Sequence, residues 1–550
     1  MKVMGKTSVS WGIRTPIGVL GQMVLVLLTV YALAFAIIDN DLPKLIFLGV
    51  VPLAIALVVA ILNDWRRGFY AFVVWILFED LIRKYLGNNM AIYFLKDFLA
   101  IILYVSFFRP KVAKKFEKFR PPFRIALALF FWLSLIQVFN FASPSLLFGI
   151  LGMKINFLYV PLLYIGYAFA KAEKDVHRLF SLLSVLILIV ASLGLAQSII
   201  GPSYLNPQTL QEDIRESSTL YRSTAGGLMA YRPTSVFVSA GRFQNFLILS
   251  WVISLGYAAY LLVRGVPKRT LAFVTVAVVG AASVMSTSRG VLMWDLGNSL
   301  VIGAAFLWGA PWRQGETTRM LRAIQRAALL TGIAMMLLTV VFPKELDSRL
   351  TVYSETLLPS SPSSELFTRT HEYPLRQLKN AFEDPRWPIG NGTGTSGLGL
   401  QYLRRIFNVP PLPIGVESGI GNIVVELGIL GLVFWLALGS AITFSAWKVV
   451  KHLRGTPWFP LAFSIFLYVV LIFFPMTYAG MPYQDFLLNS YLWLLTGILY
   501  HLYHLKQSPE KSQAAATGQG IGGMPLQPAA PIVAAHGVVE IRPQVPSAIL

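Results

Sequence analysis

The chain has 550 residues, of which 55% are hydrophobic and only 13% charged, and its mean hydropathy is +0.63. A water-soluble surface needs about a quarter of charged residues, so this composition excludes a soluble globular protein. A formal net charge of +20 would favour a nucleic-acid ligand in a soluble protein, but here membrane topology accounts for much of the excess. The chain has no cysteine, which excludes disulfides, thiolate metal sites and cysteine nucleophiles.

Long apolar runs follow one another along the chain. A membrane-spanning helix needs about 20 mostly apolar residues, and about fourteen runs meet this requirement. They predict an all-α polytopic membrane protein with helices at 17–38, 43–62, 69–86, 91–108, 123–140, 152–170, 179–200, 243–263, 270–287, 290–309, 327–342, 419–446, 459–476 and 485–504. The third and fourth runs are the weakest because both carry charges: Glu79, Asp80, Arg83 and Lys84 in one, Lys96 and Asp97 in the other.

Basic residues concentrate in alternate connections, most densely at 109–124. Because cytoplasmic connections are enriched in Lys and Arg, this alternation predicts that both termini lie in the cytoplasm. The expected organisation is an N-terminal transmembrane bundle (1–200), an outer loop (201–242), central transmembrane helices (243–342), a large outer loop with catalytic residues (343–418), C-terminal transmembrane helices (419–506) and a disordered cytoplasmic tail (507–550).

The large loop 343–418 begins its informative part with EYPLRQLKNAFEDP. Leu375, Leu378 and Phe382 recur at helical spacing, and Pro374 suits a first helical turn, so we expect a short amphipathic helix on the outer face of the bundle. The following PRWPIGNGTGTSGLGL is rich in glycine, which lets backbone N–H groups approach an anion closely.

The loop ends in GVESGIGNIVVELGILGLVFW, where a membrane helix begins directly after Glu417 and Ser418. Glu417 is therefore expected at the outer boundary between lipid and water. A carboxylate at this position is either a reactive group or a cap that complements the helix dipole. Glu426 lies inside the helix, where we expect it to form a hydrogen bond in helix packing.

These segments resemble the O-antigen polymerase and O-antigen ligase superfamily of bacterial inner-membrane glycosyltransferases. In the ligases, a late membrane helix opens with a His-Asn pair that is followed by nine residues and then by Gly-x-x-Gly. This chain has the same spacing, with Glu417-Ser418, then GIGNIVVEL, then Gly428-Ile-Leu-Gly431. The polymerases carry an Arg, fifteen residues and a Gly, a spacing that Arg376 and Gly392 have. A Ser-Arg-Gly at the outer start of a mid-chain helix is also typical, and Arg289 is its arginine here. The resemblance covers roughly residues 125–500.

The resemblance implies an inverting reaction at the periplasmic face of the bacterial inner membrane. A hydroxyl of an acceptor glycan or of lipid A core attacks an oligosaccharide carried on polyprenyl pyrophosphate. Arg is permanently charged and matches phosphate oxygens, so we expect fixed arginines to neutralise the pyrophosphate without a metal or other cofactor. The expected pyrophosphate ligands are Arg289, Arg376 and Arg232, with Asp295, Gly392 and Ser418 in support, and with Arg242, Lys154 and Asn156 as further candidates.

The proton acceptor has two candidates. Glu417 stands where the ligase pattern has His, and a carboxylate can act as the base if Val416 and Ile420 partly desolvate it. His371, in TRTHEYP, is the alternative. The resemblance leaves polymerase and ligase open, and it implies membrane lipids and chain-length regulators, but no nucleic acid, as further partners.

A lipid-linked glycan flippase or transporter is the alternative function, because many spans also suit that class. A transporter typically shows internal repeats and charges at mid-depth in the membrane, and neither is clear in this sequence.

Overall fold

The computed structural model describes residues 42–87, 89–110, 119–207, 220–223, 229–265, 269–311, 340–357, 371–397 and 416–505, together with residues 325 and 336. The chain divides into two units, Met1–Leu505 and Lys506–Leu550, and every described residue belongs to the first. The expected span at 17–38, most of the span at 327–342 and the expected tail at 507–550 lie outside the described residues.

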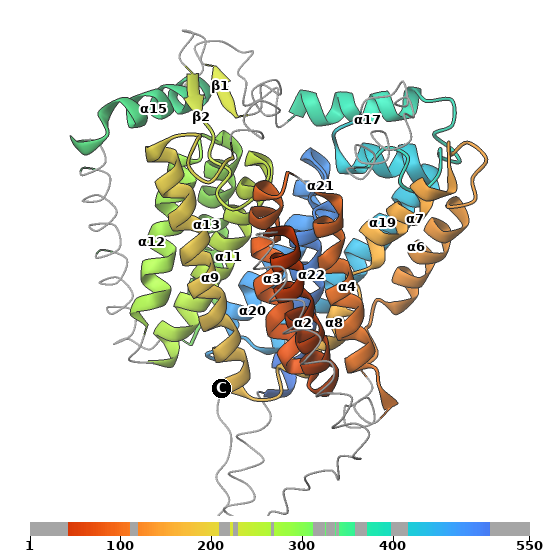
Figure 1. Ribbon diagram of the computed structural model, residues 1–550, viewed down its shortest axis with the longest axis horizontal. Coiled ribbons are helices and arrows are strands. Elements are labelled where there is room, and N and C mark those ends of the chain that lie inside the picture. Colours follow the sequence, from red (N-terminus) through yellow and green to blue (C-terminus); the bar gives the residue numbers. More distant parts are fainter. Residues whose placement is uncertain are drawn as a thin grey trace, which may run out of the picture. The chain divides into compact units, whose positions relative to one another are not determined.

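Almost every described element is an α-helix, as the apolar runs predict (Figure 1). The helices are α2 (Leu42–Asn63), α3 (Trp65–Tyr85), α4 (Met90–Phe107), α6 (Arg124–Gln137), α7 (Leu146–Phe157), α8 (Leu162–Phe169), α9 (Glu173–Ile200), α11 (Ala240–Arg264), α12 (Thr270–Met285), α13 (Arg289–Gly309), α15 (Pro343–Leu357), α17 (Tyr373–Glu383), α19 (Gly419–His452), α20 (Phe459–Phe473), α21 (Pro475–Ala479) and α22 (Phe486–Leu505). A 3-10 turn, η2 (Pro482–Gln484), precedes α22. Strands β1 (Tyr221–Ser223) and β2 (Met229–Tyr231) form an antiparallel hairpin.

Six helical segments of the described residues are long and apolar enough to cross a membrane: Leu146–Phe169, Glu173–Ile200, Ala240–Arg264, Arg289–Gly309, Gly419–His452 and Phe459–Ala479. The expected spans at 123–140 and 270–287 are helices of 14 and 16 residues, shorter than the roughly 20 that a straight span needs. A helical membrane protein is therefore confirmed, whereas the number of fourteen spans stays a prediction.

Two expected spans are broken by proline. The run at 152–170 belongs to α7 and α8, and Pro161 stands directly before α8. The run at 459–476 belongs to α20 and α21, and Pro475 is the first residue of α21. Proline has no N–H to continue a helical hydrogen-bond ladder, so it begins a new helix more readily than it continues an old one.

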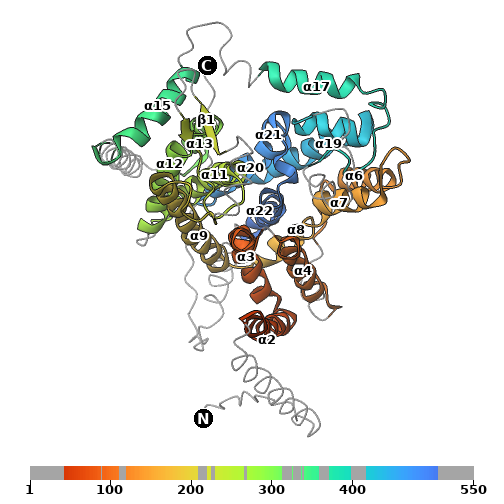
Figure 2. The same ribbon diagram turned by 45° about the horizontal axis from the view of Figure 1, so that its top comes forward.

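Helices α20 and α22 lie at the centre of the bundle (Figure 2). Helix α22 crosses α8 at close range because each has a glycine at the contact. A Cβ on Gly166 would lie 2.2 Å from Leu494 O, and a Cβ on Gly497 would lie 2.0 Å from Leu163 O. Small residues permit this backbone contact, which stabilises helix pairs in lipid through close packing.

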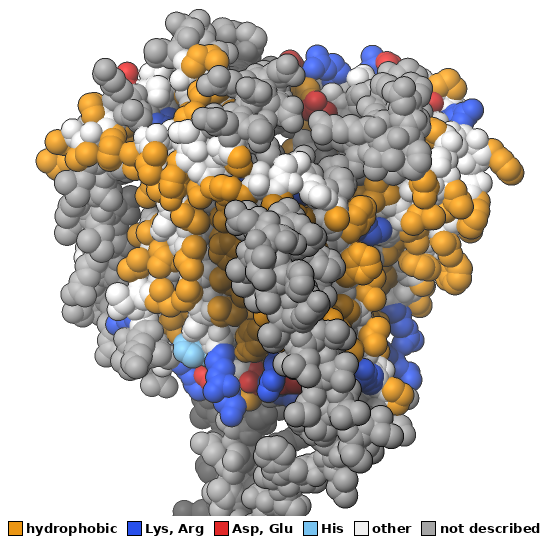
Figure 3. Space-filling model, in the orientation of Figure 1, with side chains coloured by type: hydrophobic (Ala, Val, Ile, Leu, Met, Phe, Trp, Pro, Cys, Tyr) orange, Lys and Arg blue, Asp and Glu red, His pale blue; other side chains and the backbone are white. Residues whose placement is uncertain are grey.

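The two ends of the bundle differ, and we name them the basic end and the loop end. At the basic end, Arg66 pairs with Asp175 at 3.3 Å and Arg264 pairs with Glu173 at 2.8 Å. Lys and Arg side chains gather there below a broad apolar belt (Figure 3). The loop end carries β1, β2, α15 and α17, and the starts of α4, α11, α13, α19 and α22 (Figure 1). An apolar belt between two polar ends is what a helical bundle presents to lipid.

Candidate functional site

The predicted site residues lie toward the loop end, in two separate groups. Arg232 and Arg289 belong to the segments around the β1–β2 hairpin and the start of α13. Arg376 and Glu417 belong to α17 and to the residues just before α19. Helices α13 and α17 stand on opposite sides of α21 in both views (Figures 1 and 2).

The first group is held by an unusual backbone. Arg232 directly follows β2, and Arg289 is the first residue of α13. The Thr287 hydroxyl donates to Tyr231 O at 2.7 Å, which ties the two arginine segments together. Thr287 has a φ of 56° and Ser235 a φ of 51°, a left-handed conformation that costs about 1–3 kcal/mol in a residue with a side chain. Such strain persists only where surrounding contacts hold it, and it clusters at functional sites.

Two arginines that the sequence analysis did not select join this group. Arg349 of α15 is 2% exposed and donates through Nε to Met285 O at 3.2 Å. Burial raises the pKa of Tyr353, and the charges of Arg349 and, more weakly, of Arg222 oppose that shift. We name the set Arg222, Arg232, Arg289 and Arg349 the arginine group.

The arginine group is cationic although it is largely removed from water. Burial, and to a smaller extent the nearby Arg222, lowers the pKa of Arg232 to about 10, so its guanidinium remains charged at neutral pH. Arg289 is only 8% exposed. Guanidinium groups are weakly hydrated and offer paired N–H donors that fit phosphate oxygens. The arrangement therefore suits a phosphate or pyrophosphate ligand.

Asp295 does not meet an arginine of this group. It lies about 9 Å along α13 from Arg289, at a rise of ~1.5 Å per residue. Its side chain is 5% exposed, and its carboxylate forms no ion pair with an arginine in the described part of the chain. Its expected role in orienting an arginine has no contact to support it.

The second group lies where α17 meets the start of α19. The Tyr373 hydroxyl donates to the Glu417 carboxylate, and the Glu417 N–H donates to Gln377 Oε1 at 2.9 Å. The Arg376 guanidinium lies over the Tyr373 ring, 5.6 Å from its centroid. Arg376 and Glu417 are both exposed, so the partial desolvation expected for Glu417 is not found. We name Tyr373, Arg376 and Glu417 the carboxylate patch.

The helix cap at α19 is Ser418 and not Glu417. Gly421 N–H donates to Ser418 Oγ at 3.0 Å, which satisfies one of the free donors at the start of the helix. His371 is exposed and lies two residues before Tyr373, so both candidate bases stand close to the start of α17.

The glycine run binds an anion that the chain itself supplies. Gly394 N–H and Ser396 N–H donate to the two carboxylate oxygens of Glu426 at 3.0 and 3.2 Å. Gly392 N–H donates to Glu426 O at 2.9 Å, and its φ of 104° is readily adopted only by glycine. N–H groups of the glycine run approach an anion as expected, and Glu426 takes part in hydrogen bonds as expected by accepting them. These donors are occupied by a side chain and not by a substrate.

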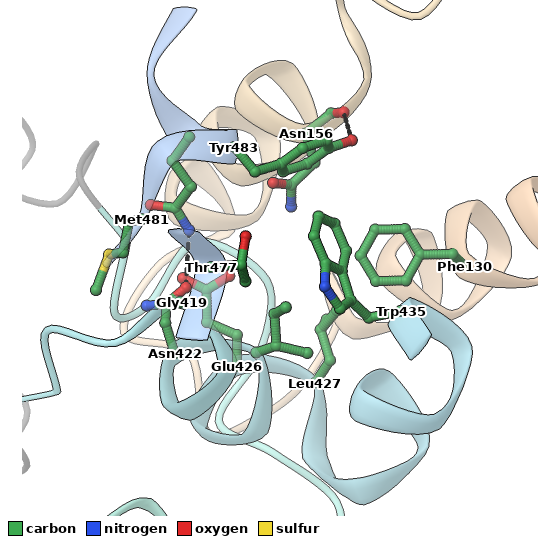
Figure 4. A pocket seen from close by; sticks show the side chains of 12 residues that line it. Phe130, Asn156, Gly419, Asn422, Glu426, Leu427, Trp435, Thr477, Met481 and Tyr483 are labelled. Carbon is green, nitrogen blue, oxygen red and sulfur yellow. Dashed lines mark hydrogen bonds between the residues drawn. The ribbon is translucent and has the colours of Figure 1, made fainter. Parts of the chain in front are cut away.

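A small cavity lies beside Glu426 (Figure 4). Asn156, Asn422, Thr477 and Tyr483 line it together with Glu426. The cavity encloses about 20 Å³, which is room for about one water molecule and not for a sugar. Asn156 lines this cavity and does not belong to the arginine group.

Sequence reasoning missed a set of charged side chains enclosed among α3, α4, α7, α11 and the start of α22. Three contacts join these helices: Lys96 to Glu79 at 3.0 Å, Lys154 to Asp97 at 2.6 Å and Arg242 to Asp80 at 2.7 Å. We name the full set the buried ion cluster; its members are Glu79, Asp80, Arg83, Lys84, Lys96, Asp97, Lys154, Arg242 and Asp485. Arg242 and Lys154, considered above as phosphate ligands, thus pair with carboxylates.

The signal for the buried ion cluster was present in the sequence as spacing. Asp80 and Arg83 stand three residues apart and so lie on one face of a helix, where they pair at 3.5 Å. In the sequence these charges make the run one of the weakest predicted spans. Opposite charges at helical spacing within an apolar run instead indicate enclosed pairs, which are costly and therefore point to function.

Among the described residues, no three His, Asp or Glu side chains gather where they could hold a metal ion, and a metal-independent reaction stays a prediction. Comparisons with protein-family models and with curated proteins found no match to this chain.

Proposed function

We propose that the chain is a membrane glycosyltransferase that moves a glycan from a polyprenyl-pyrophosphate-linked oligosaccharide to an acceptor glycan hydroxyl at the periplasmic face of the bacterial inner membrane. The observation that carries the proposal is the arginine group at the loop end, where a hydrogen bond ties the segments of Arg232 and Arg289 together, because guanidinium groups suit the oxygens of a pyrophosphate. The resemblance to O-antigen polymerases and ligases supplies the substrate class.

In the proposed reaction the acceptor hydroxyl attacks the anomeric carbon with inversion. The bond from that carbon to the phosphate oxygen breaks, and polyprenyl pyrophosphate leaves with the electron pair. Arg289 and Arg232 neutralise the charge that grows on the leaving group, an effect worth about 3–4 kcal/mol per well-placed donor. Glu417 or His371 accepts the proton of the hydroxyl.

The separation of the two groups places a requirement on the reaction. The anomeric carbon is bonded directly to an oxygen of the pyrophosphate, so the proton acceptor and the cations that neutralise the leaving group must lie beside each other when the donor reacts. Arg376 provides a cation on the side of Glu417, above the Tyr373 ring. The proposed reaction therefore requires the start of α13 and α17 to approach each other around the donor.

A lipid-linked glycan flippase is the second candidate function, and the buried ion cluster favours it. Lys96 and Asp97 lie about 9–11 Å along α4 from its first residue, at ~1.5 Å per residue, and both are buried. Charges enclosed at depth among helices are typical of transporters.

Reconstitution separates the two functions. The purified chain is placed in liposomes with labelled donor and with acceptor. A transferase releases polyprenyl pyrophosphate and lengthens the glycan, whereas a flippase moves the donor across the bilayer without cleaving it. Loss of transfer in EDTA that is restored by Mg²⁺ would contradict the metal-independent scheme.

A deletion strain separates the finer alternatives on a gel of its surface polysaccharide. A single unextended repeat on the lipid anchor indicates a polymerase, and long polymer left on the carrier indicates a ligase. Absence of periplasmic glycan supports the flippase instead.

A further inference from the structure

We propose that Lys84 of α3 and Gln197 of α9 are positioning residues, which hold the loop 232–239 so that Arg232 can contact the pyrophosphate of the donor. This inference deepens the proposed function and rests on it for the identity of the ligand. It concerns two side chains that are enclosed by the protein and that touch no substrate.

Lys84 reaches from the end of α3 into the loop. Its Nζ donates to Thr234 Oγ1 and to Ser235 O, both at 2.8 Å. Lys84, Thr234 and Ser235 are each 0% exposed. Burial of an ammonium group costs several kcal/mol unless hydrogen bonds compensate, and both hydrogen bonds of this ammonium go to the loop.

Gln197 of α9 contacts the same two residues. Its Oε1 accepts the N–H of Thr234 at 2.8 Å and the N–H of Ser235 at 2.7 Å. The Ser235 hydroxyl donates to Val190 O at 2.7 Å. These contacts hold Ser235 in its left-handed conformation, which the isolated loop would leave.

The far end of the loop is held by the buried ion cluster. Asp80 Oδ2 accepts from Arg242 Nη1 at 2.7 Å and from Val238 N–H at 3.4 Å. Asp80 and Lys84 are neighbours on one face of α3, so that face contacts the loop at two points.

The position of Arg232 depends on that of Thr234, because only one residue separates them in the chain. Pro233 lies between them, and its ring restricts φ, so a displacement at Thr234 is passed to Arg232 with little relaxation. The Lys84 and Gln197 contacts therefore act on the arginine group through the backbone.

A double-mutant cycle on the full-length protein tests the inference. The probe is geranylgeranyl pyrophosphate, measured by isothermal titration in detergent, with geranylgeranyl monophosphate as comparison. We expect Lys84→Met and Arg232→Gln each to weaken binding about 10- to 100-fold, because each removes a charged hydrogen-bond donor. The double variant should bind within about twofold of Arg232→Gln alone, since Lys84 acts through Arg232.

Lys96→Met is the matched control. It removes an equally buried ammonium from the buried ion cluster, but its partner is Glu79 and not the loop. In the double variant Lys96→Met with Arg232→Gln, the fold losses in probe affinity of the two single variants should multiply. Thr234→Val, which removes one acceptor of Lys84 and keeps the side-chain volume, replaces Lys84→Met if that variant does not fold.

A second readout does not depend on the ligand. In Lys84→Met, amide hydrogen exchange at Thr234 and Ser235 should accelerate at least about 10-fold, whereas Lys96→Met should leave exchange at these two residues unchanged. If wild-type protein binds pyrophosphate and monophosphate probes equally, the proposed function fails, although the loop contacts are still tested by exchange. The positioning role of Lys84 would be overturned if the affinity losses of Lys84→Met and Arg232→Gln multiplied in the double variant. Unchanged amide hydrogen exchange in Lys84→Met would overturn it as well.

Discussion

Arg289 and Arg232 illustrate how a side chain becomes a candidate ligand for pyrophosphate. Each lies within three residues of a residue with strained backbone, and a hydrogen bond from Thr287 to Tyr231 O joins their segments. A guanidinium presents several N–H donors in one plane, whereas an ammonium presents a compact charge without that geometry. The shape of the donor group, and not charge alone, should therefore matter at both positions.

Arg289→Lys keeps the charge and removes the planar donors. We expect glycan transfer to fall about 10²–10³-fold, the loss typical of one transition-state donor, with little change in folded protein. Initial rates of polyprenyl pyrophosphate release measure the effect. The control is Arg264→Lys at the basic end, which pairs with exposed Glu173 and should stay within about twofold of wild type. Equal rates for the two variants would remove Arg289 from the site.

Glu417 and His371 can be distinguished because both are exposed, so that their replacement leaves the packing of the core intact. We expect Glu417→Gln to lower transfer by about 10²–10⁴-fold through loss of the base, and His371→Gln to have less than about a twofold effect. Tyr373→Phe, which removes the hydrogen bond to Glu417, controls for disturbance of the carboxylate patch. Polymer of normal length in Glu417→Gln would exclude this carboxylate as the base.

In helix α19 a single glycine interrupts the helix and changes what packs against it. Gly428 interrupts the helix with a φ of 70°, and the turn of residues 388–390 packs against the interruption. Asn391 N–H and Gly392 N–H then use the carbonyl groups of Val425 and Glu426, which the interrupted helix leaves available. The Gly-x-x-Gly frame therefore has a structural role at its first glycine.

Gly428→Ala should destabilise the protein strongly. The added Cβ would lie 2.5 Å from Pro388 O, and the left-handed φ is unfavourable for alanine. We expect a loss of at least about 1–3 kcal/mol, seen as a lower Tm in detergent. Gly303→Ala in α13 is the control, because no neighbour lies near its Cβ and alanine favours a helix interior by about 0.5–1 kcal/mol. A Gly428→Ala protein as stable as this control would contradict the structure at the kink.

The helices also show where prediction from the sequence failed and why. Apolar runs predicted the positions of α9, α11, α13 and α19 well, because length and hydropathy are local properties. Single proline residues divided two other runs into shorter helices. The charges of α3 make its run one of the weakest predicted spans, because Glu79 has its partner on α4 and Asp80 has a partner on α11, and neither can be identified from α3 alone.

At the scale of the whole molecule, the charge difference between the two ends favours one orientation in the membrane. Arg66 and Arg264 lie at the basic end, which we expect to face the cytoplasm. Under the proposed function, we expect the arginine group and the carboxylate patch to face the periplasm, where a polyprenyl-linked donor would be presented.

The absence of cysteine makes this orientation directly testable. Lys379→Cys on α17 and Arg67→Cys at the basic end introduce thiols at side chains that are 76% and 72% exposed. In intact cells, a membrane-impermeant maleimide should label Lys379→Cys alone. Arg67→Cys should react after permeabilisation, which also shows that its thiol is accessible. Labelling of Arg67→Cys in intact cells would reverse the assigned topology.

Composition and the lengths of the apolar runs determined that this chain is a helical membrane protein, and the spacing of Arg376, Glu417 and the glycines drew attention to the loop before α19. The tertiary structure alone decided which charged side chains of different helices contact one another, because those contacts depend on how the helices pack. Lys84 and Thr234 are 150 positions apart in the chain, and their contact follows from the packing of α3 beside the loop after β2. Local sequence determines a helix through short-range hydrogen bonds and hydropathy, whereas a site built from distant segments forms only when their burial fixes all of them at once.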